Sequence, residues 1–389
     1  MAESITHINP KMFIWAREVS GTTEIEAIDK FGKEKLYGWE NGTVFPTYAE
    51  LKVIGKYYRK PIAVFFFPEP PNMKDIPASC RTFPIEERGV FDRSLTKMVD
   101  WARSMQINLF ELNGGVNNVT RKITDITFDT SDLSSVAKQL RTLMNIDISK
   151  QKSFRTRDEA FEQWRHCFFE LGVYVFKNSF SGNDVSGFCI YDKEFPVICI
   201  NNGLAHSRQI FTLFHEMYHL ICATSGVDLL DDDTLISQVD RFDISVELAC
   251  NKFAGTFLVP DDDFAKVSRG KAFNDTAIQR WADLYSVSRD VILYKLYEKD
   301  RITFDTLIEK RREYTEDYFR KFQVDESGKK KGGGNYYSTQ AAYKGRQYLE
   351  LAYRRYYEKK ISLPQLSQYL NMKVHNVKEL ASQKGWGAV

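Results

Sequence analysis

The chain has no long apolar run of the kind that crosses a membrane. Its longest uninterrupted apolar stretch lies at residues 62–67, whereas a membrane-spanning helix needs roughly 20 such residues. The first ten residues, MAESITHINP, also lack the basic and then apolar pattern of a secretory signal. These absences predict a cytoplasmic protein with no membrane partner.

Cysteine is scarce and irregularly spaced. Six cysteines occur in 389 residues, without a CxxC pair. They are Cys80, Cys167, Cys189, Cys199, Cys222 and Cys250. This pattern is typical of buried thiols in a reducing compartment, and it predicts neither a disulfide framework nor a second metal site.

Apolar content, in contrast, is ample. Hydrophobic residues make up 43% of the chain and aromatic residues 14%, which is enough to form buried cores and excludes wholesale disorder. A chain of 389 residues is expected to form two or three domains.

Histidine is rare, with six residues in the chain, yet two of them share one pentad. Residues 215–219 are His215-Glu216-Met217-Tyr218-His219. The apolar residues around them recur at three- and four-residue spacing, namely Ile210, Phe211, Phe214, Met217, Tyr218 and Ile221. Such spacing predicts an amphipathic helix that carries the pentad.

This pentad is the HExxH pattern of zinc peptidases. On a helix, His215 and His219 lie one turn apart on one face, so both imidazoles can bind one metal ion. Glu216 is placed to accept a proton from a water held by that ion. The alternative is a buried helix whose histidines are only packed or hydrogen-bonded. A complete HExxH on an apolar helix favours the catalytic zinc site.

A catalytic zinc ion takes three protein ligands, so a third is expected. Residues 243–260, DISVELACNKFAGTFLVP, predict a second apolar helix, on which Glu247 follows His219 by 28 positions. Asn251 shares a face with Glu247 and could steady a ligand histidine. The competing candidates are Asp231-Asp232-Asp233 and Asp240, which lack apolar periodicity and are typical of a solvated loop.

These two segments resemble the ImmA/IrrE (DUF955) metallopeptidase family. The resemblance rests on FTLFHEMYHL followed by E-x-x-x-N-x-F-A-x-x-x-L-x-P, and it covers roughly residues 150–310 well. The family usually has a second glutamate where this chain has Ala249, and smaller residues where it has Phe214, Met217 and Tyr218. The resemblance implies a zincin-like fold and a DNA-bound repressor as substrate, with cleavage derepressing genes of a mobile element or a stress response.

The segment before the HExxH helix contains the patterns of several strands and helices. Residues 173–180, 185–192 and 194–202 are rich in β-branched and aromatic residues, with turn signals between them. Residues 92–113 and 131–146 predict helices. We therefore expect an α+β, mostly helical protein, in which a small antiparallel sheet leads into the HExxH helix.

The N-terminal region is similar to the phage-repressor (XRE) type of helix-turn-helix. Its apolar spacing predicts helices at 10–19, 23–30, 33–39 and 47–58. The candidate DNA contacts are Lys33, Lys35 and Tyr37. Two features argue against DNA reading: Gly38 weakens the recognition helix, and nine basic residues face seven acidic ones over 11–60. Docking or homodimer formation is the alternative.

Further helix-turn-helix patterns follow at 277–300 and 361–381, with a Gly-rich linker between them. Residues 329–389 contain twelve Lys or Arg against three Glu, whereas residues 228–263 contain ten acidic residues against two basic. A basic C-terminus can contact DNA, although a solvated surface explains the charge equally well. The expected segments are 1–75, 76–149, 150–265, 266–324, 325–336 (linker) and 337–389.

The favoured function is a zinc-dependent endopeptidase that acts on a specific cytosolic protein. One zinc ion would be held by His215, His219 and Glu247, with Glu216 as the base. His206 is a candidate donor to the transition state, although a helix-end or solvent-exposed position is the alternative. The second hypothesis is a DNA-binding regulator or antitoxin-like protein whose peptidase fold serves as a scaffold or sensor.

Overall fold

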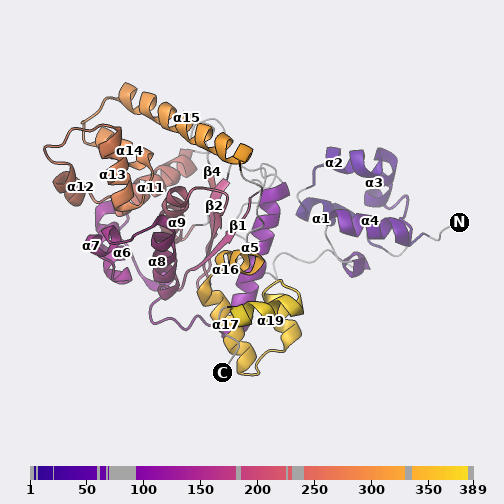
Figure 1. Ribbon diagram of the computed structural model, residues 1–389. Helices are drawn as coiled ribbons and strands as arrows, with labels where there is room; N and C mark the ends of the chain where they lie inside the picture. Colours follow the sequence, from indigo (N-terminus) through magenta and orange to yellow (C-terminus); the bar gives the residue numbers. More distant parts are fainter. Residues whose placement is uncertain are drawn as a thin grey trace. The chain divides into compact units, whose positions relative to one another are not determined.

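A computed structural model describes residues 4–5, 8–20, 22–58, 62–66, 69, 93–180, 185–224, 227–229, 241–328 and 335–383. These residues fall into two compact units that divide near residue 101 (Figure 1). Within the described residues, no helix is both long enough and apolar enough to cross a membrane.

The N-terminal unit contains helices close to the expected ranges. Its elements are α1 (Lys11–Val19), α2 (Glu24–Phe31), α3 (Lys33–Asn41), α4 (Tyr48–Tyr58) and the 3-10 helix η1 (Ile62–Phe66). A capping box between Thr23 and Glu26 begins α2, because each side chain accepts a bond from the other residue's backbone N–H. The core of the unit includes Met12, Phe13, Trp39, Leu51, Ile54 and Phe65.

The second unit is built on a four-stranded sheet with the order β1-β3-β2-β4. The strands are β1 (Tyr174–Asn178), β2 (Val185–Ile190), β3 (Val197–Asn201) and β4 (Val227–Leu229). Strand β2 pairs antiparallel with β3 and β4, but β1 pairs parallel with β3, with Tyr174 opposite Val197. The sheet is therefore mixed, and the expectation of a purely antiparallel sheet was wrong. The reason is that β3 turns back from β2 and inserts beside β1.

The HExxH segment lies on α9 (His206–Ile221), which packs between the sheet and two other helices. Helix α9 packs on β2 and β3, while α8 (Arg157–Glu170) and α11 (Arg241–Leu258) pack on α9. Gly187 of β2 permits the close approach of α9, because a Cβ there would lie 2.6 Å from Cγ2 of Thr212 and 2.8 Å from the carbonyl oxygen of Cys199. Thr212 is one turn before His215, so this glycine sets how close the pentad lies to the sheet.

One hydrophobic core extends from Ile123 to Tyr314. It joins α6 (Leu133–Met144), α8, α9, α11, α12 (Asp261–Ser268), α13 (Asp275–Tyr285), α14 (Arg289–Glu298) and α15 (Phe304–Gly328). The short elements η5 (Ile123–Asp125) and α7 (Ile148–Lys152) lie in the same stretch. The expected boundaries at 149/150 and 265/266 thus fall inside a shared core rather than between separate ones.

The expected linker is shorter than 325–336. Helix α15 continues to Gly328, because residues 304–327 contain neither glycine nor proline. Residues 329–334, with the Lys and Gly runs, lie outside the described part of the chain. The next helix begins at Tyr336.

The C-terminal helices pack against the sheet domain. They are α16 (Tyr336–Lys344), α17 (Arg346–Tyr357), α18 (Leu363–Tyr369) and α19 (Val374–Gln383). Helix α16 covers the edge strand β1. The buried guanidinium of Arg165 donates to the carbonyl oxygens of Val175 (2.6 Å), Ala342 (2.8 Å) and Tyr343 (3.2 Å). Arg165 therefore ties α8, β1 and the end of α16 together.

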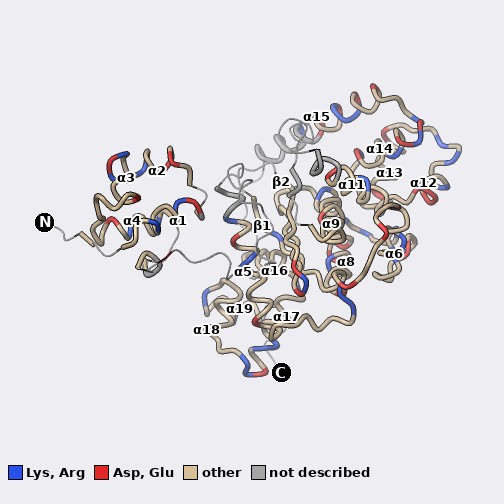
Figure 2. Tube along the Cα trace, turned by 180° about the vertical axis from the view of Figure 1, so that it is seen from behind, with Lys and Arg blue, Asp and Glu red and all other residues tan. Residues whose placement is uncertain are grey.

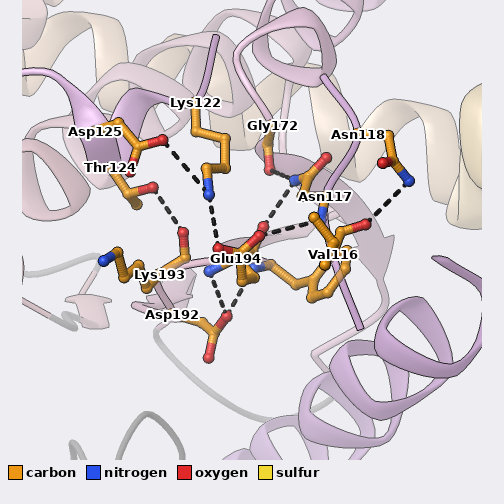
Figure 3. Close-up of polar contacts among 11 residues, drawn as sticks. Val116, Asn117, Asn118, Lys122, Thr124, Asp125, Gly172, Asp192, Lys193 and Glu194 are labelled. Atoms are coloured by element: carbon orange, nitrogen blue, oxygen red, sulfur yellow. Dashed lines mark hydrogen bonds and ion pairs between the residues drawn. The ribbon is translucent and has the colours of Figure 1, made fainter. Parts of the chain in front are cut away.

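A polar network fixes the turn between β2 and β3 (Figure 3). It lies beside the segment that follows α5 (Arg93–Asn113). The Asn117 amide donates to the carbonyl oxygens of Gly172 (3.0 Å) and Glu194 (2.7 Å). The Lys122 ammonium donates to the Glu194 carboxylate at 2.6 Å, and this bond holds the pKa of Glu194 below its usual value. The hairpin that delivers β3 to the sheet centre is thereby anchored.

Candidate metal centre

Helix α9 presents the two histidines of the pentad as the sequence predicts. His215, Glu216 and His219 are all buried, with at most 2% of any of them exposed. The Nε2 atoms of His215 and His219 are 3.3 Å apart. Two ligands at about 2.0–2.1 Å from a tetrahedral ion are separated by roughly 3.3 Å, so the two imidazoles have the spacing that one zinc ion requires.

The carboxylate of Glu247 reaches both histidines from α11. Its Oε2 lies 3.0 Å from Nε2 of His215, and its Oε1 lies 3.1 Å from Nε2 of His219. Burial raises the pKa of Glu247, but hydrogen bonds from the two imidazoles outweigh it and lower that pKa to about 2. The group is therefore anionic at neutral pH and suited to a divalent cation.

A partner on the far nitrogen orients each imidazole. Nδ1 of His215 lies 3.0 Å from Oδ1 of Asn251, and Nδ1 of His219 lies 3.2 Å from Oγ1 of Thr224. Because an amide oxygen only accepts, Nδ1 of His215 carries a hydrogen, so the neutral ring would bind a metal through Nε2. This arrangement leaves Nε2 of His215 able to bind a metal.

Sequence reasoning missed Thr224. The residue follows the end of α9. The preceding residue, Ala223, adopts a positive φ of 55° and reverses the direction of the chain. The Thr224 N–H donates to the carbonyl oxygen of His219 at 2.9 Å, which places its hydroxyl beside the ring. A threonine five residues after the second histidine carries no signal of its own in one sequence.

Sequence reasoning also missed Cys250. One ligand atom from each of His215, His219 and Cys250 lies within 4.8 Å of the other two. Cys250 is buried and follows Glu247 by three residues on α11. The available signal was this spacing, which puts Cys250 and Glu247 on neighbouring positions of one helix face.

Glu216 lies beside the histidines on the buried side of α9. Its negative charge adds to burial in raising the pKa of the Cys199 thiol on β3. The carboxylate therefore lies within electrostatic range of the central strand as well as of the candidate ligands. Two imidazoles, one carboxylate and an adjacent carboxylic base together fit a catalytic zinc centre.

His206 does not reach this centre. It is the first residue of α9, nine residues before His215, which corresponds to about 13 Å of helix rise. Its Nε2 lies 3.6 Å from a carboxylate oxygen of Asp158. This position at the start of α9, beside Asp158, is the helix-end alternative for His206. The competing candidates Asp231-Asp232-Asp233 and Asp240 lie outside the described residues.

The three candidate DNA contacts lie on α3, and two of them bind acidic residues of their own unit. The Lys35 ammonium donates to Glu50 at 2.7 Å, and the Tyr37 hydroxyl donates to Glu24. Lys33 is exposed, and its ammonium lies 5.8 Å from the centre of the Tyr37 ring. Acidic and basic residues are interspersed along α1–α4 (Figure 2).

We expect Asn251→Ala to weaken zinc binding by about 10–100-fold, because the His215 ring loses the group that fixes its orientation. Competition with a chromophoric chelator measures this affinity. Asn251→Asp keeps the oxygen acceptor and should bind zinc more tightly than the alanine variant. Lys252→Ala, at the adjacent exposed position, is the matched control. An unchanged affinity in Asn251→Ala would contradict the assignment.

Known proteins are similar to this chain in the segment that carries the candidate metal centre. Residues 169–297 match the model of the IrrE N-terminal-like domain family. The radiation response metalloprotease IrrE of Deinococcus radiodurans is 32% identical over 115 residues, which are 28% of this chain and 33% of that protein. The protein of the same name in Deinococcus deserti is 35% identical over 120 residues, which are 28% of this chain and 38% of that protein.

The chain thus spans 33% and 38% of the length of these two relatives. The matched family segment, 169–297, contains the pentad, Glu247 and Asn251. Residues 169–297 therefore match an IrrE N-terminal-like domain, in agreement with the resemblance of this segment to the ImmA/IrrE metallopeptidases.

Proposed function

We propose that the chain is a zinc-dependent endopeptidase. The observation that carries the proposal is the contact of one Glu247 carboxylate with Nε2 of both His215 and His219, at 3.0 and 3.1 Å. These three groups would hold the ion. When bound, zinc would supply Lewis-acid chemistry by activating water and polarising the scissile carbonyl.

Side chains of the protein would orient the ligands and transfer the proton. Asn251 and Thr224 hold the imidazole rings in the orientation that binding requires. Glu216 would accept the proton of the attacking water and deliver it to the departing amine. The buried position of Glu216 keeps bulk water from competing for that proton.

The proposed substrate is a DNA-binding transcriptional repressor in the same compartment, the cytoplasm. Resemblance to the ImmA/IrrE family supports this choice, and the two Deinococcus relatives bear the name of radiation response metalloproteases. Cleavage would derepress genes of a mobile element or of a stress response. A helix-turn-helix repressor, if one is encoded beside this gene, is the first substrate to test.

The test combines metal content with cleavage. Purified protein should contain about one zinc per chain and should cut the neighbouring repressor at a defined site, as seen by mass spectrometry. A zinc chelator should stop the cleavage, and added zinc should restore it. Metal-free protein that cleaves at the same rate would refute the proposal.

DNA binding by the C-terminal helices is a second candidate function. Helices α18 and α19 are joined by a short turn, and their contacts bury Leu366, Leu370, Val377 and Leu380. Lys373, His375 and Lys378, at and after the start of α19, are exposed. This is the arrangement in which a second helix can enter a major groove.

We expect Lys373→Glu/Lys378→Glu to weaken low-salt DNA binding and to reduce the slope of log affinity against log salt by about 1–2. Lys33→Glu/Lys35→Glu should have the smaller effect, since the basic excess is nine charges over 329–389 (12 minus 3) and two over 11–60 (9 minus 7). Mobility shifts measure both. Point variants are preferred to deletion, because α16 covers β1. A larger effect of the N-terminal pair would reverse the assignment.

A further inference from the structure

The candidate metal centre contains a donor that a peptidase site does not need. Cys250 is fully buried, and its sulfur lies within 4.8 Å of the ligand atoms of His215 and His219. Catalytic zinc sites have three protein ligands and an open fourth position, whereas structural sites are closed by four. Glu247 already supplies the third group, so the sulfur is additional.

We propose that Cys250 is an exchangeable fourth ligand, which closes the centre and makes the peptidase latent. This inference rests on the proposed zinc site of His215, His219 and Glu247. On binding, the Cys250 thiol would lose its proton and its sulfur would take the position of one water. No electron is transferred, and the reverse step reopens the position at which substrate reacts.

The geometry supports exchange rather than permanent ligation. Zinc–sulfur and zinc–nitrogen bonds of about 2.3 and 2.0–2.1 Å put the two ligand atoms roughly 3.6 Å apart on a tetrahedral ion. The sulfur of Cys250 lies within 4.8 Å of the histidine ligand atoms, a limit that includes this spacing, but the group of side chains within that limit does not contain Glu247. A side-chain rotation of Cys250 would therefore be needed to bring all four donors to one ion. Both Glu247 and Cys250 are carried by α11, so a slight shift of this helix moves the two donors together.

Two other described cysteines donate to backbone carbonyl oxygens. The Cys167 thiol donates to the carbonyl oxygen of Met144, and the Cys189 thiol donates to that of Thr224. Within the described part of the chain, the group of candidate metal-binding side chains contains Cys250 and no second cysteine. A soft thiolate also favours zinc over harder ions such as manganese.

Cobalt spectroscopy of the full-length protein tests the proposal. Cobalt(II) replaces zinc and gives a near-ultraviolet charge-transfer band when a thiolate binds it. The wild-type protein should show this band, and Cys250→Ala and Cys250→Ser should lose it while still binding about one cobalt per chain. Cys167→Ala is the matched control and should keep the band.

The possible results separate this inference from the proposed function. A wild-type protein that binds cobalt without the band, or a band that persists in both Cys250 variants, overturns the role of Cys250 alone. A wild-type protein that binds no cobalt overturns the metal site as well. Retained metal in the two variants also shows that they are folded, and faster repressor cleavage by Cys250→Ala would support latency directly.

Discussion

Replacing Glu216 by glutamine is expected to leave the metal content unchanged and to lower the cleavage rate by at least about 100-fold. The amide keeps the shape of the side chain but cannot accept the proton of the attacking water. Because Glu216 is completely buried, no solvent-exposed base can take its place easily. Cleavage of the repressor and metal analysis on the same sample measure both quantities.

The control is Glu309→Gln, which changes an exposed carboxylate on α15 and should leave cleavage and metal content as in the wild type. Full activity in Glu216→Gln would remove this residue as the base. Loss of metal in that variant would instead mean that Glu216 is itself needed for binding.

Replacing Glu247 by alanine is expected to abolish stoichiometric zinc binding. The carboxylate supplies the negative charge that faces both imidazoles. Without it the ion would have the two imidazoles and only the exchangeable sulfur of Cys250, so we expect the zinc to be lost on dialysis. Metal analysis after dialysis measures the stoichiometry. Thermal unfolding gives an independent reading, since zinc should raise the midpoint of the wild type but not that of the variant.

Asp240→Ala is the informative comparison, because Asp240 and the Asp231–Asp233 run competed with Glu247 as third ligands. That variant should retain one zinc per chain. If Glu247→Ala retains zinc and Asp240→Ala loses it, the third ligand is in the acidic segment and is not Glu247.

The sequence by itself determined the features that depend on local spacing. The i and i+4 positions of His215 and His219 put both on one helix face before any tertiary contact is known. The N-terminal helices were also predicted closely, because apolar periodicity and turn residues act over a few positions. Asn251 was found in the same way, from its i+4 relation to Glu247.

Only the tertiary structure decided the relations between distant segments. Packing of α11 on α9 brings Glu247 and Cys250 to the histidines, and a turn through Ala223 brings Thr224 to His219. Strand character did not reveal that β3 lies between β1 and β2, since a strand's sequence does not encode its neighbour. Nor did composition reveal that one core joins residues 123 to 314, because apolar residues record burial but not the partner that buries them.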